Sequence, residues 1–154
     1  MDIAIVVPLI VAFLGAALGA YFAFVKTRKE RLWSDRYDAI RNVILSLEKI
    51  QANFETREMH ERGVQVVTST ECERLEEEWP AARQSLRTSV ATLRLLFKDK
   101  EIAAVLERYQ DLNQAFLLMF GGTNIQYAVL FGEVAKNAEK AIEEAIRLAQ
   151  KRCL

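Results

Sequence analysis

The chain has 154 residues with 21 basic and 21 acidic side chains, so its formal net charge is zero and gives no reason to expect a nucleic-acid partner. One histidine and two cysteines, without a CxxC pair, make a zinc site built from protein ligands alone hard to form.

The first predicted element is a membrane-spanning helix over residues 3–25. These 23 residues carry no charge. A helix of that length is about 34 Å long, which exceeds the hydrocarbon core of roughly 30 Å. A cleaved signal peptide would begin with basic residues and have a shorter apolar run, and a buried helix of a water-soluble protein is seldom uncharged for so long. The sequence therefore predicts a transmembrane anchor in residues 1–25 and a second domain in residues 26–154.

Basic residues indicate the orientation of this anchor. None precedes the apolar run, and four follow it directly: Lys26, Arg28, Lys29 and Arg31. Because Lys and Arg are enriched on the cytoplasmic side of membrane spans, we expect the N-terminus outside and the second domain in the cytoplasm, at the plasma or inner membrane of the cell. The four bases would then lie against the membrane surface, and the two cysteines would be kept reduced.

Small residues recur every fourth position within the predicted span, on two adjacent rows of one helix face. They are Ala12, Gly15, Ala16, Gly19, Ala20 and Ala23. Gly and Ala at this spacing allow a second helix to approach closely in lipid, which predicts a homo-oligomer that associates through the span. A lone anchor is the alternative, because small residues are frequent in membrane spans.

The second domain is predicted to be all-α, with about four helices near residues 26–59, 70–97, 100–119 and 125–152. No Gly or Pro lies between Gly19 and Gly63, so the first helix is expected to continue from the anchor without a break. Short connections favour an up-down antiparallel bundle. Apolar residues at helical spacing predict its core. They include Trp33, Tyr37, Ile40, Leu47, Phe54, Leu75, Trp79, Leu86, Leu93, Ile102, Leu112, Phe116, Phe120, Val129, Val134, Ala138, Ala145 and Leu148.

Two features of the helix ends are expected as well. Thr70 and Glu73 have the spacing of a capping box, and Asp99 is placed to cap the third helix.

In an antiparallel bundle, Lys98, Lys100 and the basic residues near the C-terminus would face the membrane. This distribution has two explanations, anionic lipid headgroups and the preference of helix C-termini for cations, which can act together.

No motif for nucleotide binding, zinc hydrolysis, acyl transfer or calcium binding occurs in the chain. We therefore expect no enzyme and no cofactor or metal, but an interaction, scaffold or regulatory module at the cytoplasmic face of the membrane with an unspecified protein partner. The expected partner surface is the far tip of the bundle, with Glu73, Glu76, Glu77, Glu78, Met119 and Phe120. The apolar segment 115–132 is either deep core or an exposed docking tip.

A second hypothesis assigns the chain to a different class. In it, the small-residue face of the span assembles several copies into a structure that perturbs or permeabilises the membrane.

Overall fold

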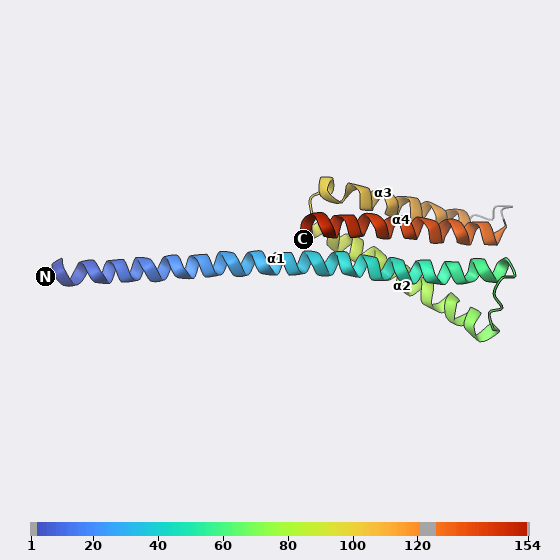
Figure 1. Cartoon of the computed structure of the whole chain (residues 1–154), viewed down its shortest axis with the longest axis horizontal. Coiled ribbons are helices and arrows are strands. Elements are labelled where there is room, and N and C mark those ends of the chain that lie inside the picture. The colour runs from blue at the N-terminus through green and yellow to red at the C-terminus, as the bar shows by residue number, and fades with distance from the viewer. Residues whose placement is uncertain (1–2, 121–125, 154) are drawn as a thin grey trace. The chain divides into compact units, whose positions relative to one another are not determined.

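The structure is a computed structural model that describes the backbone of residues 3–120 and 126–153 and the side chains of residues 13–120 and 126–151. Four helices account for nearly all of these residues, and no strand occurs among them (Figure 1). They are α1 (Ile3–Glu61), α2 (Ser69–Leu96), α3 (Asp99–Phe120) and α4 (Tyr127–Cys153). The all-α class and the four helices predicted from the sequence are confirmed.

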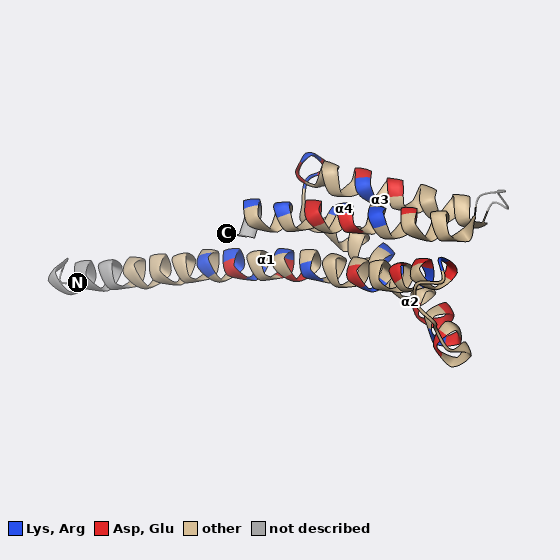
Figure 2. Ribbon diagram, turned by 45° about the vertical axis from the view of Figure 1, so that its right-hand side comes forward, with Lys and Arg blue, Asp and Glu red and all other residues tan. Residues whose placement is uncertain are grey.

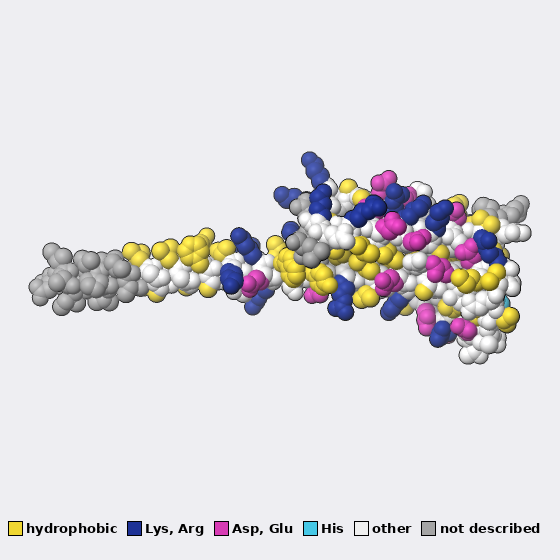
Figure 3. Space-filling model, in the orientation of Figure 1, with side chains coloured by type: hydrophobic (Ala, Val, Ile, Leu, Met, Phe, Trp, Pro, Cys, Tyr) yellow, Lys and Arg dark blue, Asp and Glu magenta, His cyan; other side chains and the backbone are white. Residues whose placement is uncertain are grey.

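The chain forms two compact units, Met1–Asp35 and Arg36–Leu154. In the first unit the described part is helical, and its large apolar side chains are exposed (Figure 3). Phe13 is 74% exposed, and Phe22 and Phe24 are each 66% exposed. No helix in the described part of the chain is long and apolar enough to cross a membrane. The structure thus does not support the span predicted over residues 3–25, of which only residues 13–25 have described side chains, fewer than the roughly 20 that a crossing needs.

In the second unit, the C-terminal part of α1 and the helices α2, α3 and α4 share one apolar core. The largest side chains that are almost fully buried are Phe54, Phe116, Ile40, Leu47, Ile50, Leu86, Leu93, Ile102, Leu112, Val43 and Val134. On α4 the buried positions are mostly alanines, namely Ala135, Ala138, Ala141 and Ala145. Small side chains at these positions let neighbouring helices pack close to the α4 backbone.

An aromatic cluster in this core contains side chains from all four helices. Phe54 of α1 is fully buried, and its ring centroid is 5.9 Å from Trp79 of α2, 5.7 Å from Phe116 of α3 and 5.7 Å from Phe131 of α4. Phe54 meets Trp79 and Phe116 edge to face, an arrangement that aromatic pairs prefer. Phe54 thus contacts an aromatic ring from each of the other three helices.

Some residues of the predicted apolar stripes are not buried. Trp33 and Tyr37 are 51% and 46% exposed, and burial along α1 begins at Ala39 and Ile40. Phe120 and Val129 are also exposed. Helical spacing identifies the apolar face of a helix, but it does not tell where along the helix a neighbouring helix ends.

The ends of α2 and α3 also differ from the prediction. Thr68, not Thr70, is the N-cap of α2, and its hydroxyl accepts a hydrogen bond of 3.3 Å from the Glu71 N–H. Asp99 does not cap α3 but is its first residue. Instead, the carboxylate of Glu101 accepts a 3.0 Å hydrogen bond from the Lys98 N–H. Glu101 thereby satisfies a backbone donor that would otherwise have no partner at the start of the helix.

His60 organises the connector between α1 and α2. Its Nδ1 lies 3.3 Å from the Val67 N and 3.2 Å from the Gln65 carbonyl oxygen. Gly63 has a φ of +70°, a left-handed conformation that glycine adopts without strain. These features close the connector into a tight turn.

Candidate protein-docking surface

One end of the second unit, here named the distal end, consists of the α1–α2 connector, the C-terminus of α3 and the N-terminus of α4, which lie together in Figures 1 and 2. Seven apolar side chains are exposed on these segments: Val64, Val66, Leu117, Leu118, Phe120, Tyr127 and Val129. The exposed fraction reaches 91% at Val66 and 67% at Leu117. Residues 121–125, which the sequence places in the same hairpin, lie outside the described residues.

The predicted acidic residues border the distal end from the first turns of α2. Glu73, Glu76, Glu77 and Glu78 are all exposed, and acidic residues gather on this part of α2 in Figure 2. Arg74 lies within ion-pair distance of Glu78, at 3.5 Å, and of Glu71, at 3.7 Å. Such exposed pairs contribute little to stability. Much of the negative charge of this segment thus stays available to a partner.

Met119 and Phe120 do not contribute equally. Met119 is half-buried and packs against the core, so it is not part of an open surface. Phe120 stacks on Trp79 with 5.5 Å between ring centroids and is still 60% exposed. Leu117 and Leu118, in the preceding turn of α3, offer more exposed apolar area than Met119. The sequence signal for them was the run from Phe116 to Phe120, which is apolar on every side of the helix.

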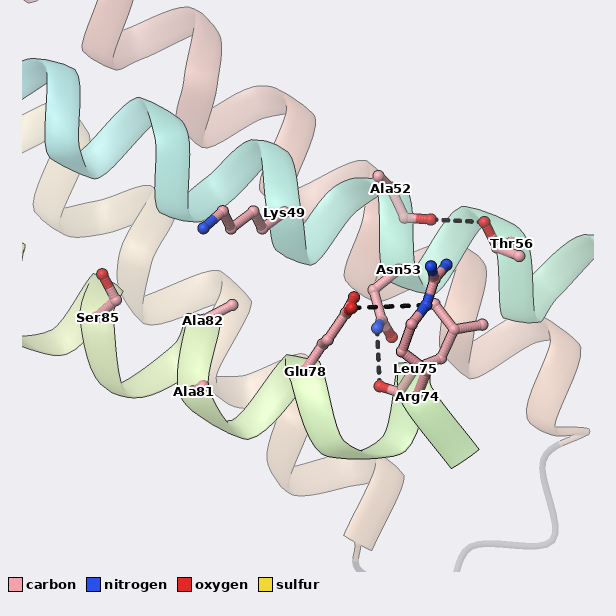
Figure 4. Close-up of a pocket in the computed structure, with 10 residues that line it drawn as sticks. All are labelled: Lys49, Ala52, Asn53, Thr56, Arg74, Leu75, Glu78, Ala81, Ala82 and Ser85. Carbon is pink, nitrogen blue, oxygen red and sulfur yellow. Dashed lines mark hydrogen bonds and ion pairs between the residues drawn. The ribbon is translucent and has the colours of Figure 1, made fainter. Parts of the chain in front are cut away.

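A groove of about 550 Å³ lies beside the acidic segment, between α1 and α2 (Figure 4). Small side chains from both helices form much of its wall: Ala52, Ala81, Ala82 and Ser85. Lys49, Arg74 and Glu78 add charge to its lining. Because the facing side chains are short, they leave the space between α1 and α2 unfilled.

Asn53 lines this groove and is only 4% exposed. Its Nδ2 donates a 2.8 Å hydrogen bond to the Leu75 carbonyl oxygen, and its Oδ1 is buried without a partner. If the side-chain amide of Asn53 were turned by 180°, its oxygen would face the Leu75 carbonyl oxygen. The hydrogen bond to this carbonyl therefore fixes the orientation of the amide. Nothing in the spacing of the sequence marked Asn53, because an asparagine on a helix is most often exposed.

Asn53→Asp is expected to destabilise the bundle by about 2–4 kcal/mol at pH 7, because a buried carboxylate would face the Leu75 carbonyl in place of a donor. The folded state should disfavour the charged carboxylate and raise its pKa above the unfolded value. The loss should therefore be small below the unfolded pKa of about 3.9 and increase as the pH rises. Urea unfolding of the variant across that pH range measures the effect. Equal stability at acidic and neutral pH would contradict it.

Among the described residues, Arg57 is the other side chain with buried polar atoms that lack a hydrogen-bond partner. Its guanidinium lies 5.6 Å from the ring centroid of Phe54 and 5.8 Å from that of Phe131, while Nε and Nη2 are buried without a hydrogen bond. Burial lowers the pKa of Arg57, and the nearby Glu76 opposes this shift. The adjoining cavity, of about 110 Å³, is lined by Glu76 and Glu61 as well, so it does not favour an anion.

Arg57 and Arg36 form a matched pair for measuring the effect of unsatisfied donors. Arg36 also lies over an aromatic ring, 4.9 Å from the centroid of Phe97, but its Nε donates a 3.0 Å hydrogen bond to the Leu96 carbonyl. We expect Arg36→Met to lower the free energy of unfolding by about 1–2 kcal/mol and Arg57→Met by less than about 1 kcal/mol, since methionine also removes the buried donors that lack partners. Chemical denaturation of both variants tests the difference, and a larger loss for Arg57→Met would refute it.

The residues predicted for association and membrane contact belong to the first unit. Adding a Cβ at Gly15 or Gly19 would meet no atom within 4 Å, so this face is open. Ala16, Ala20 and Ala23 are exposed, as are the predicted surface bases Lys26, Arg28, Lys29 and Arg31. The side chain of Ala12 lies outside the described residues.

No group of three or more His, Cys, Asp or Glu side chains in the described part of the chain is arranged to hold a metal ion. Comparisons of the chain with protein-family models, with curated proteins and with solved structures found no match. A function for this protein is therefore inferred from the exposed surfaces of its chain.

Proposed function

We propose that the protein is an interaction module held at the cytoplasmic face of a membrane by its first 25 residues, with a protein partner docking on the distal end. The observation that carries the docking role is the exposed apolar group at that end, where Val66 is 91% and Leu117 is 67% exposed. Exposed apolar patches of this kind mark interaction sites more often than other surfaces do. The glutamates beside it favour a partner whose contact region is apolar with a basic border.

The anchoring part of the proposal is supported by the 23 uncharged residues at positions 3–25 and by the four bases that follow them. The exposed Phe13, Phe22 and Phe24 are also in accord with lipid contact, since these rings have no described protein neighbour that buries them. The open face at Gly15 and Gly19 would allow two anchors to pack together in lipid.

Site-specific photo-crosslinking in intact cells tests the docking role. A benzophenone amino acid would replace Leu118 on the distal end, and in a control it would replace the exposed Lys140 of α4. We expect a crosslinked protein from position 118 that position 140 does not give. Combining the Leu118 probe with Glu76→Lys, Glu77→Lys and Glu78→Lys should abolish it. The same products from both positions, or products unaffected by the charge reversal, would overturn the docking role.

The open Gly15–Gly19 face also keeps the membrane-effector function as a second candidate. In that case overexpression should let a membrane-impermeant dye enter the cells, and Gly15→Leu with Gly19→Leu should prevent entry by blocking close helix packing. Intact membranes at the same level of expression would exclude it.

A further inference from the structure

The end of the second unit opposite the distal end is rich in basic side chains. This basic end contains the α2–α3 turn and the C-terminal part of α4, which lie together in Figures 1 and 2. Residues 83–100 hold five bases and one acid, whereas residues 71–78 at the start of α2 hold five acids and one base. Dark blue side chains project from this end of the bundle in Figure 3. The charge along α2 thus changes from acidic in its first turns to basic in its second half and in the turn to α3.

Helix dipoles do not account for all of these bases. Arg94 and Lys151 lie near helix C-termini, where the dipole favours a cation. Lys98 and Lys100, in contrast, lie at the start of α3, where the dipole disfavours one. None of these four side chains forms an ion pair with another described residue. The helix dipole therefore does not explain the positions of Lys98 and Lys100.

An exposed apolar side chain lies among these bases. Leu95 is 86% exposed, although it belongs to the last turn of α2. The turn around it is held firmly, because Phe97 is 6% exposed and the Arg36 Nε donates to the Leu96 carbonyl oxygen at 3.0 Å. Arg36 also lies 4.9 Å from the centre of the Phe97 ring. The fold thus presents Leu95 to the outside on a well-packed turn.

We propose that this basic end docks on the surface of a membrane that contains anionic phospholipid, with Arg94, Lys98 and Lys100 near the headgroups and Leu95 directed into the interface. This inference depends on the proposed function, in which the anchor brings the second unit to a membrane. One apolar side chain surrounded by unpaired bases fits a lipid interface. A protein partner would instead require a larger apolar area, as the distal end provides.

Spin-label depth measurements on the full chain test the proposal. Cysteine would be introduced at Leu95 in a Cys72→Ser, Cys153→Ser background, labelled, and reconstituted into phosphatidylcholine vesicles with or without phosphatidylserine. We expect the label at position 95 to become more accessible to oxygen and less accessible to a water-soluble nickel complex when phosphatidylserine is present. A label at Leu118 on the distal end should not change. A label at position 95 that stays equally accessible to nickel in both vesicle types overturns the docking.

Charge variants make the test quantitative. Arg94→Gln, Lys98→Gln and Lys100→Gln should together reverse the change in accessibility, with the docking equilibrium weakened about fivefold for each base, the factor that corresponds to roughly 1 kcal/mol. The control is Lys49→Gln, Lys136→Gln and Lys140→Gln, which removes the same charge elsewhere on the bundle. Equal effects of the two triple variants would overturn a site-specific contact.

Failure of the anchor can be told apart from failure of this inference by alkaline carbonate extraction. A chain that resists extraction but shows no lipid contact at position 95 retains the anchor and refutes the docking. A chain that carbonate removes from the membrane, but that still binds phosphatidylserine vesicles at low salt through position 95, supports the docking and refutes the anchor.

Discussion

Phe54→Ala is expected to lower the free energy of unfolding of the bundle by about 3–5 kcal/mol. Phe54 is fully buried and contacts Trp79, Phe116 and Phe131, so its removal leaves a cavity bounded by side chains from three other helices. A loss of this size is comparable to the whole stability of many small domains. Urea unfolding of the full chain in mild detergent, followed by circular dichroism, measures it.

Leu118→Ala is the matched control for this prediction, because Leu118 lies in the same end of the bundle but is 51% exposed. Its truncation should change the free energy of unfolding by less than about 0.5 kcal/mol. If Phe54→Ala cost no more than Leu118→Ala, the aromatic cluster would not be a main source of the stability of the bundle.

The second large effect concerns the proposed anchor. Leu14→Arg together with Leu18→Arg should transfer the chain from the membrane fraction to the soluble fraction. An arginine at the centre of a span costs about 2.5–3.5 kcal/mol on the insertion scale, so two should outweigh the net apolarity of residues 3–25. Fractionation after alkaline carbonate treatment, with detection of the full-length chain, is the measurement.

Leu32→Arg provides the control, since Leu32 is exposed and follows the predicted span. This variant should remain in the membrane fraction like the unaltered chain. Recovery of the unaltered chain in the soluble fraction without detergent would remove the anchor from the proposed function, and the docking role of the distal end would then have to be tested in solution.

The helices of this chain are predictable because its Gly and Pro residues are few and long stretches contain neither. The interval between Gly19 and Gly63 contains neither, and α1 continues through it to Glu61. The N-cap of α2 was harder to predict for a physical reason. Both Thr68 with Glu71 and Thr70 with Glu73 have the capping-box spacing, so local sequence alone does not distinguish the two starts.

The candidate surfaces were predictable only in part. The exposed glutamates follow from their charge, and exposure of Phe120 follows from the Gly-Gly sequence after it, but burial of Met119 depends on how α3 packs against the core. The unpartnered oxygen of Asn53 depends on where α2 brings the Leu75 carbonyl, a contact between residues 22 positions apart. Such tertiary contacts leave no trace in helical periodicity.

The position of Phe131 in the aromatic cluster has a consequence for synthesis of the chain. Phe54 acquires all of its aromatic neighbours only when α4, which follows the other three helices in the chain, has packed beside it. Until then the nascent chain exposes apolar faces of three helices, as incompletely folded chains do. A fragment that ends before α4 would therefore leave its apolar core uncovered. Proteases would cleave such a fragment and chaperones would bind it.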